Sequence, residues 1–340
     1  MNHLSTKITA GIITAAILIV AFCSYDALSG SCESAQVADV VKRTAQSAVP
    51  AAAFPASSAV SSAASAPVIL TEKPDGTVVK DAAKLKSSLC SPSAILVRLD
   101  DRTILLDKNA EQRIYPASMT KIMTVLLAIE ESPDLNEKVT IRKSVIDRMN
   151  SLDASMAGFV ADEQVSELDL LYGALLPSGA ECCASLADCL EGSEQNFAVS
   201  MNRRAAALGM KNTHFMNTSG LHNPGHTTTV KDLAVLLNCA LQNSTFRRVF
   251  TTQSYTTSPT NKHAGGVSFR STMFRCLESQ KAGRATILGG KVGYTDEAGL
   301  CLASLAELDG KEYVLVTAGA KNVYRAEIKD ALTVYGSLGK

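Results

Sequence analysis

The stretch ILGGKVGYTDEAGLCLASLAELDGKEYVLVTAGA, residues 287–320, contains three strand-like segments in close succession. They cover 287–295, 299–308 and 312–320, and apolar residues recur along each of them. Asp309–Gly310 separates the last two segments and is typical of the tight turn of a β-hairpin. The stretch therefore predicts consecutive antiparallel strands in one sheet.

Two further strands are expected far upstream of this stretch. SAILVRLD (93–100) and TILLDKN (103–109) are strand-like and meet at Asp101–Arg102, which predicts another hairpin. The segments between and after the strands have helical patterns, over 117–131, 165–191, 194–208, 228–243 and 325–338. The order predicts an α+β fold, with one antiparallel five-stranded sheet flanked by helices, a separate all-helical lobe and a cleft between the two.

The overall composition excludes several classes of protein. The chain has 340 residues, and its 33 basic and 33 acidic side chains give a formal net charge of zero. A nucleic-acid-binding protein needs a basic stripe to meet the phosphate backbone, so no nucleic acid partner is expected. Apolar residues make up 46% of the sequence, which suffices for a buried core and excludes bulk disorder and a protein with many membrane spans.

An uncharged apolar run, residues 8–25, lies near the amino terminus. As a helix it extends roughly 27 Å, close to the thickness of a bilayer core. Lys7 precedes the run, whereas Asp26 and Glu33 follow it, so the rest of the chain is expected outside the cytoplasm. We interpret residues 1–30 as a membrane anchor or a signal segment, and favour the anchor because no small-x-small cleavage pattern follows directly.

A low-complexity stretch follows this segment. Residues 45–67 are almost entirely Ala, Ser and Pro and carry no charge. Such a composition buries little surface and favours an extended, flexible spacer. We therefore expect a spacer over 31–87 and a catalytic domain over 88–340.

The nine cysteines do not form a metal-binding pattern. They contain no C-x-x-C pair, so a zinc site or a dense disulfide scaffold is not expected. Cys239 and Cys301 lie inside apolar stretches and are expected to be small buried residues. No metal or other cofactor is predicted.

A serine and a lysine lie one helical turn apart at the start of an expected helix. Ser118-Met119-Thr120-Lys121 is an S-x-x-K sequence, and its i to i+3 spacing puts the hydroxyl and the amine on one face. A lysine in a dry cleft has a lowered pKa and can take the proton of the serine hydroxyl. The pair therefore indicates a serine nucleophile with a lysine base.

Two further segments strengthen this interpretation. PSGAE (177–181) places Ser178 on an expected turn before a cysteine-rich helix. GGKVGYT (289–295) lies on a strand and offers a second cation, Lys291, followed by Gly293, whose missing side chain lets a substrate backbone approach. Each segment alone is a weak signal, but the three in this order are far more specific.

The sequence resembles the serine D-alanyl-D-alanine carboxypeptidases, the low-molecular-mass penicillin-binding proteins, over about residues 88–338. The segments that carry the resemblance are YPASMTKIMT, LYGALLPSGAECCASLAD, FMNTSGLHNPGHTTTVKDLA, GGKVGYTDEAGLCLAS and AGAKNVYRAEI. The resemblance implies removal of the terminal D-alanine from peptidoglycan stem peptides that end in D-Ala-D-Ala, with β-lactams as covalent inhibitors. Family members serve in wall maturation, sporulation or glycopeptide resistance, and the sequence leaves that role open.

The resemblance also assigns roles to individual residues. Ser118 is the expected nucleophile, Lys121 its general base, and Ser178 the relay that protonates the leaving amine. Residues expected to bind the substrate are Lys291, Gly293, Tyr294 and Arg325, the two cations holding its carboxylate. The backbone N–H groups of Ser118 and Tyr294 are the expected oxyanion hole.

Two positions depart from the family pattern. Its second motif is usually S-x-N and its third K-T-G, whereas this chain has Ala180 and Val292 at the variable positions. Each lost hydrogen bond is worth about 1–3 kcal/mol, unless Glu181, Thr295 or water replaces it. Glu181 is expected either as a first-turn helix residue or as a base for deacylation.

The departures leave alternative functions open. A catalytically impaired homologue that only binds wall peptides would retain the fold without turnover. A β-lactamase would need fast deacylation, and no clear E-x-x-L-N sequence is present to activate water. His222 and His226 lie in a polar loop and are expected to be structural, because the lysine-based mechanism requires no histidine.

Overall fold

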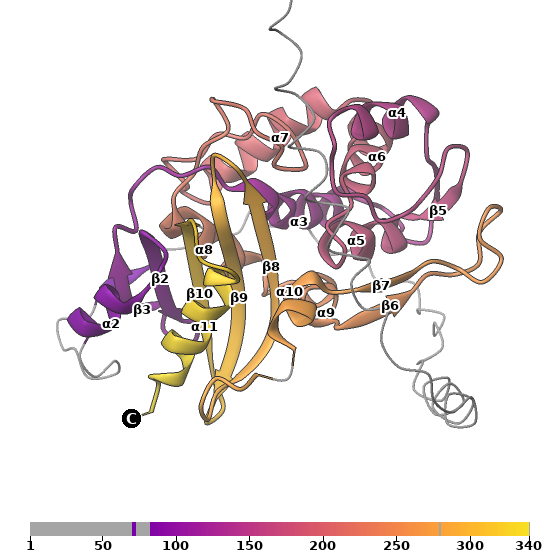
Figure 1. Ribbon diagram of the computed structural model, residues 1–340. Helices are drawn as coiled ribbons and strands as arrows, with labels where there is room; N and C mark the ends of the chain where they lie inside the picture. The colour runs from indigo at the N-terminus through magenta and orange to yellow at the C-terminus, as the bar shows by residue number, and fades with distance from the viewer. Residues whose placement is uncertain (1–69, 73–81, 279, 340) are drawn as a thin grey trace, which may run out of the picture. The chain divides into compact units, whose positions relative to one another are not determined.

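The computed structural model describes residues 70–72, 82–278 and 280–339 (Figure 1), all within the unit Phe54–Lys340. The expected membrane anchor or signal segment, 1–30, lies outside the described residues, as does most of the expected spacer. Within the described part, no helix is both long and apolar enough to cross a membrane.

A mixed sheet forms the centre of the described residues. Its strand order is β1-β3-β2-β10-β9-β8, with six strands in the part of the chain that is described. The predicted five antiparallel strands are confirmed as β2 (Ser93–Arg98), β3 (Thr103–Lys108), β8 (Thr286–Thr295), β9 (Gly299–Leu308) and β10 (Lys311–Ala320). A two-residue strand, β1 (Thr71–Glu72), adds to β3 in parallel and was not predicted.

Strand β10 joins the early and the late parts of the chain. It pairs with β2 on one side, where Val314 lies opposite Val97, and with β9 on the other, where Val314 lies opposite Leu305. The turn between β9 and β10 is the expected one, since Asp309 and Gly310 have φ values of 52° and 74°. Strand β8 pairs with β9 and forms one edge of the sheet in the described residues.

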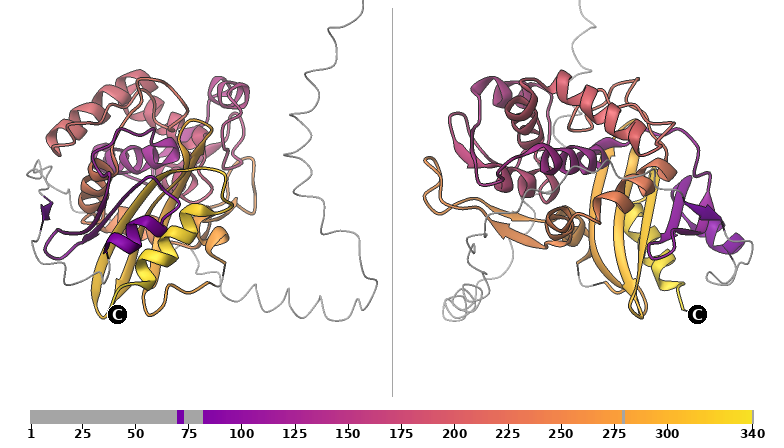
Figure 2. Two further views of the ribbon diagram at one scale, coloured as in Figure 1. Left: turned by 60° about the vertical axis from the view of Figure 1, so that its left-hand side comes forward. Right: turned by 180° about the vertical axis from the view of Figure 1, so that it is seen from behind.

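Alternate side chains of the strands enter two different cores, one on each face of the sheet. Ala303, Leu305 and Val316 belong to the larger core, which includes helix α8 (Val230–Ala240) and the helical lobe. Leu302 and Leu315 belong to the smaller core, beneath α2 (Ala82–Ser88), α10 (Thr272–Leu277) and α11 (Ala326–Gly336). Figure 2 shows α2 and α11 side by side over this face.

Helix α2 changes the expected domain boundary. It lies in the range assigned to the spacer, yet Leu85 is buried and packs in the smaller core together with Leu89. The described fold therefore extends into the expected spacer. The cause is local, because the Ala- and Lys-rich composition of this segment favours a helix and Leu85 supplies its apolar contact.

The helical lobe contains α3 (Lys121–Glu131), α4 (Lys143–Ser151), α5 (Glu167–Leu175), α6 (Ala180–Glu191) and α7 (Glu194–Ala207). Serine side chains begin two of these helices, since Ser166 accepts the N–H of Asp169 and Ser193 accepts that of Asn196. The expected helical range 165–191 is interrupted by a turn over 176–179, where Ser178 was expected. Cys182 and Cys183 lie buried on α6.

Several short elements were not predicted. The three-residue strands are β4 (Lys138–Thr140) with β5 (Gln164–Ser166), and β6 (Ser254–Thr256) with β7 (Ser268–Arg270). Helix α9 (Ser244–Thr251) precedes β6, and the N–H groups of its first turn donate to Asn243. Three residues are too few to show the alternation that identifies a strand in a sequence.

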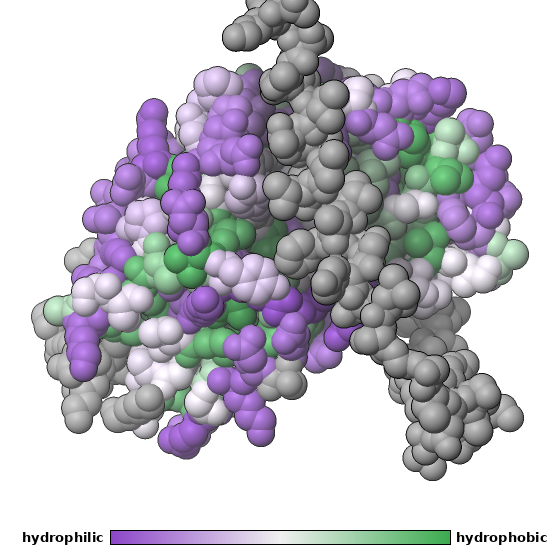
Figure 3. Space-filling model, viewed as in Figure 1, coloured by the Kyte–Doolittle hydropathy of each residue, from purple (hydrophilic) through white to green (hydrophobic). Residues whose placement is uncertain are grey.

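In the view of Figure 3, apolar residues gather in patches that are bordered by polar residues. The large apolar residues that are exposed come from separate elements: Leu152, Val160, Val199, Met216, Tyr294 and Tyr324. Cys239 and Cys301 are buried, as predicted. The pattern is typical of a folded domain with its apolar residues in two cores.

Candidate active site

Ser118 lies in a short 3₁₀ turn, η2 (Ala117–Thr120), that leads into α3. Lys121 is the first residue of α3, and its Nζ lies 3.0 Å from Ser118 Oγ. Ala117 has a φ of 46°, a left-handed conformation that costs a non-glycine residue about 1–3 kcal/mol and persists where the surroundings hold it. The turn thus presents the serine hydroxyl to the amine, as the i to i+3 spacing predicted.

Lys121 is buried, with only 2% of its surface exposed. Besides Ser118, its Nζ donates to the carbonyl oxygen of Ser219 at 2.7 Å. Burial lowers the pKa of Lys121, while nearby groups of α6 and α7 oppose the shift. A lowered pKa enlarges the fraction of neutral amine, and the neutral amine can accept the proton of the hydroxyl at the same contact.

A second hydroxyl and amine meet next to the first pair. Nζ of Lys291, on β8, donates to Ser178 Oγ at 2.9 Å and to the carbonyl of Val292 at 2.8 Å. Lys291 is fully buried, and burial together with the charge of Lys121 lowers its pKa well below the usual value. Ser178 lies in the turn before α6 with a φ of 74°. The second and third sequence motifs are therefore in direct contact.

Gly293 brings strand β8 against the nucleophile turn. A Cβ atom at this position would lie 3.0 Å from Ser118 N, 3.2 Å from the Ala117 Cβ and 3.3 Å from the Pro116 carbonyl oxygen. These distances are tighter than most Cβ contacts, so a larger residue here would push the strand and the turn apart, and glycine favours their close approach. Ser118, Lys121, Ser178 and Lys291 therefore lie together at one place, between the helical lobe and the edge of the sheet.

The loop over residues 217–226 completes the surroundings of Lys121. Thr124 Oγ1 donates to the carbonyl of Thr218 at 2.7 Å, and Asn217 Oδ1 accepts the N–H of Gly220 at 2.7 Å. These bonds hold the Ser219 carbonyl over the amine. No feature of the sequence indicated this contact, because a backbone carbonyl has no side chain that marks it.

Replacing Gly220 with alanine is expected to lower the free energy of unfolding by about 2–3 kcal/mol. Gly220 has a φ of +83°, and an added Cβ would lie 1.8 Å from the carbonyl oxygen of Ala117. Urea unfolding of the purified protein measures the change. Gly310→Ala is the matched control, because its φ is +74° but nothing lies within 4 Å of the added atom. Equal losses in the two variants would contradict the expected clash.

Both histidines of the loop have structural contacts. His226 is buried. Its Nε2 lies 2.9 Å from Thr120 Oγ1, and its Nδ1 accepts the N–H of Met216 at 3.3 Å. Burial lowers the pKa of His226 to about 4, so the ring is neutral and Nε2 carries the proton. His222 Nδ1 lies 3.6 Å from a carboxylate oxygen of Glu297.

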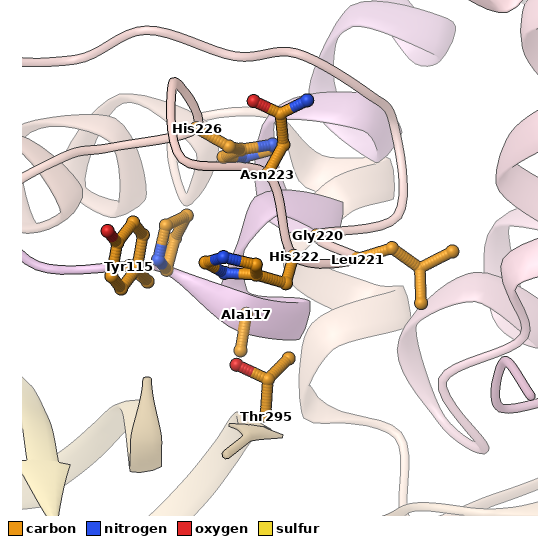
Figure 4. Close-up of a pocket in the computed structure, with 9 residues that line it drawn as sticks. Tyr115, Ala117, Gly220, Leu221, His222, Asn223, His226 and Thr295 are labelled. Atoms are coloured by element: carbon orange, nitrogen blue, oxygen red, sulfur yellow. The ribbon is translucent and has the colours of Figure 1, made fainter. Parts of the chain in front are cut away.

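A pocket lies beside the nucleophile turn. Figure 4 shows its lining, which comes from the turn, the 217–226 loop and the end of β8: Tyr115, Pro116, Ala117, Gly220, Leu221, His222, Asn223, His226 and Thr295. The ring of Tyr115 packs edge-on against that of His222, with centroids 4.9 Å apart.

Two of the expected substrate-binding residues have other contacts. Tyr294 is 59% exposed, and its hydroxyl donates to Asp296 at 2.7 Å. Arg325 donates to Glu278 Oε1 at 2.6 Å and to the Cys276 carbonyl at 3.1 Å. Among the described residues, the hydrogen-bond partners of its guanidinium therefore lie at the end of α10, and neither Lys291 nor Ser118 is one of them.

The two departures from the family pattern have apolar surroundings. Ala180 packs in a small cluster with Val145, Met149 and Ala184. Val292 is partly buried against the smaller core. Neither side chain supplies a polar group to the site. The neighbouring Glu181, in contrast, is fully buried, and its carboxylate accepts the N–H groups of residues 157–158.

Comparisons with known proteins find matches over most of the chain. A family model described as D-alanyl-D-alanine carboxypeptidase matches residues 43–322. The D-alanyl-D-alanine carboxypeptidase DacF of Bacillus subtilis is 30% identical over 256 residues, which are 74% of this chain and 64% of that protein. The D-alanyl-D-alanine carboxypeptidase of Streptomyces sp. strain K15 is 32% identical over 239 residues, which are 68% of this chain and 81% of that protein.

Solved structures agree with these matches. The crystal structure of the Streptomyces K15 DD-transpeptidase has a TM-score of 0.67 and 30% identity, covering 73% of this chain and 97% of that one. A D-alanyl-D-alanine carboxypeptidase from Mycobacterium tuberculosis has a TM-score of 0.65 and 25% identity, covering 73% and 90%. This chain spans less than two thirds of DacF, but nearly the whole length of the Streptomyces structure.

Proposed function

Because this chain belongs to the D-alanyl-D-alanine carboxypeptidase family of serine peptidases, we propose that it removes the C-terminal D-alanine from peptidoglycan stem peptides or their precursors. The observation that carries the proposal is the 3.0 Å contact between Lys121 Nζ and Ser118 Oγ, in a turn against which strand β8 packs closely at Gly293. A hydroxyl in contact with a buried amine is what acyl transfer to serine requires.

In the acylation step, neutral Lys121 takes the proton of Ser118 Oγ as the oxygen attacks the carbonyl carbon of the penultimate D-alanine. The N–H groups of Ser118 and Tyr294 stabilise the resulting oxyanion. The C–N bond then breaks, and the proton that Lys121 took from Ser118 passes through the hydroxyl of Ser178 to the leaving amine, so that Lys121 is neutral again. That hydroxyl accepts a hydrogen bond from Lys291, whose N–H groups also attract the terminal carboxylate of the substrate.

In the deacylation step, water replaces the lost D-alanine. Lys121 takes a proton from the water, whose oxygen attacks the ester carbonyl, and returns this proton to Ser118 Oγ as the ester bond breaks. The products are the stem peptide shortened by one residue and the regenerated serine. A β-lactam enters the same first step, and its ring-opened acyl group remains on Ser118.

We further propose where the enzyme acts. The substrate is part of the bacterial cell wall, so the catalytic domain, expected over 88–340, acts on the outer side of the cytoplasmic membrane. The apolar segment within residues 1–30 supports either retention at the membrane or export of the chain. Arg325 joins the carboxylate site only if it leaves Glu278, its partner in this structure.

Intact-mass measurement after incubation with penicillin, and release of D-alanine from a peptide ending in D-Ala-D-Ala, test the proposed function. We expect one acyl adduct, located on the proteolytic peptide that contains Ser118, and one D-alanine per peptide cleaved. Binding of the peptide without release of D-alanine would instead favour the impaired, wall-binding alternative. Rapid loss of the penicillin adduct would favour a β-lactamase.

A further inference from the structure

A buried carboxyl group lies directly after the second motif. Glu181 is fully buried, and its Oε1 accepts the N–H groups of Ala157 at 2.6 Å and Gly158 at 3.0 Å. Its Oε2 is buried as well and has no hydrogen-bond partner among the described residues. A Cβ at Gly179 would lie 2.9 Å from this oxygen, so the carboxyl group fills the space beneath the turn.

The same segment, residues 155–158, contacts the turn at further points. Ala180 N donates to the carbonyl of Ser155 at 2.8 Å, and a Cβ at Gly179 would lie 2.7 Å from the Ala157 side chain. Together with the bonds to Glu181, these contacts fix the end of the turn that leads into α6. Ser178 lies within it in a left-handed conformation that needs such support.

Glu181 is also one of the groups whose charge acts on the Lys121 amine. The titratable groups that face Lys121 are Cys183, Glu181 and Cys182 from α6, Glu194 from α7 and Lys291 from β8. Burial is the largest influence and lowers the pKa of Lys121, while the α6 and α7 groups act in the opposite direction. Burial raises the pKa of Glu181, and its backbone N–H partners oppose that shift.

We propose that Glu181 is a positioning residue of this acyl-transfer site, which holds the turn that carries Ser178 and supplies the negative charge that balances the Lys121 amine. The inference rests on the proposed function. In this arrangement, the charge and the hydrogen-bond acceptor come from Glu181, because the methyl group of the neighbouring Ala180 can supply neither.

The test compares Glu181→Gln with Glu181→Leu, using the rate of penicillin acylation as a function of pH. Glutamine keeps an oxygen for the two N–H groups but removes the charge, so protonated Lys121 loses stabilisation and its pKa falls. The pH at which acylation reaches half its maximum should therefore shift downward by about 0.5–1 unit, with the maximal rate retained within about threefold. Leucine removes the acceptor too, so the maximal rate should fall about tenfold or more.

Glu167→Gln is the matched control. Glu167 is another buried carboxyl with an unpartnered oxygen and a pKa raised by burial. Its carboxylate accepts from the thiol of Cys189, which lies eight residues after Glu181 on α6, so the two positions on that helix are roughly 12 Å apart. It should leave the pH midpoint of acylation unchanged. Thermal unfolding of each variant separates a loss of fold from a loss of rate.

An unchanged pH midpoint in Glu181→Gln, in an enzyme that acylates normally, would overturn the inference and leave the proposed function intact. If the unmodified enzyme formed no adduct and released no D-alanine, the proposed function would fail instead. In that case NMR titration of the lysine side chains still tests the charge of Glu181, since the pKa of Lys121 must be lower in Glu181→Gln than in the unmodified chain. An equal pKa in both would reject the inference.

Discussion

Ser118→Ala is expected to abolish both the penicillin adduct and the release of D-alanine, a loss of at least about 10⁴-fold in rate. Within the described residues, the hydrogen-bond partners of the Lys121 amine are Ser118 Oγ and the Ser219 carbonyl, and a carbonyl oxygen has no proton to give. The nearby hydroxyl of Ser178 is bonded to Lys291 instead. The base would therefore have no hydroxyl to activate.

The measurement for Ser118→Ala is intact mass after penicillin treatment, together with chromatography of the peptide products. Ser151→Ala serves as the matched control. Ser151 is an exposed serine at the end of α4, and among the described residues its hydroxyl donates to the carbonyl of Arg148 in its own helix. It should react like the unmodified enzyme. A persistent adduct in Ser118→Ala would mean that a different side chain is the nucleophile.

The sequence predicts those parts of the structure that depend on local spacing. The Asp309–Gly310 turn, the five long strands and the Ser118–Lys121 pair each follow from residues within a few positions of one another. A turn needs particular φ values at two residues, and a helical start places residue i beside i+3. These constraints depend on neighbouring residues and not on tertiary contacts, so the sequence is enough to predict them.

Contacts between distant segments are not fixed by such spacing. Lys291 and Ser178 are 113 residues apart, and a resemblance rather than a periodicity placed them in one site. Ser219 was not recognised, since it acts through its backbone carbonyl. The support of the Ser178 turn by residues 155–158 also depends on a loop whose sequence, Ser-Met-Ala-Gly, contains no charged group that would indicate a partner.

Arg325 illustrates a different limit of the sequence. The resemblance placed it with the substrate carboxylate, but the structure pairs its guanidinium with Glu278. Both partners are charged, and a carboxylate at the end of α10 competes for the same donors as a substrate carboxylate does. The course of the backbone in both segments decides which carboxylate an arginine contacts. The sequence of residues 276–278 does not indicate that this segment would lie beside Arg325.

Lys121→Met is expected to reduce the rate of acylation by about 10²–10⁴-fold while leaving Ser118 in place. Methionine has nearly the length of lysine and suits a buried position, but it cannot accept the proton of the hydroxyl. Lys121→Arg is the matched control for charge, because its guanidinium stays protonated and cannot act as a base either. Both variants should therefore lose acylation, even though one of them retains the cation.

The pH dependence of the unmodified enzyme tests the same role for Lys121. Burial lowers the pKa of its amine below the usual value of 10.5, so the neutral form appears earlier as the pH rises. Acylation should increase with pH and level off above this lowered pKa, because only the neutral amine can take the proton of Ser118. Stopped-flow measurement of penicillin acylation gives the profile. A rate that continued to rise up to pH 10.5, or a Lys121→Arg variant with normal acylation, would show that another group is the base.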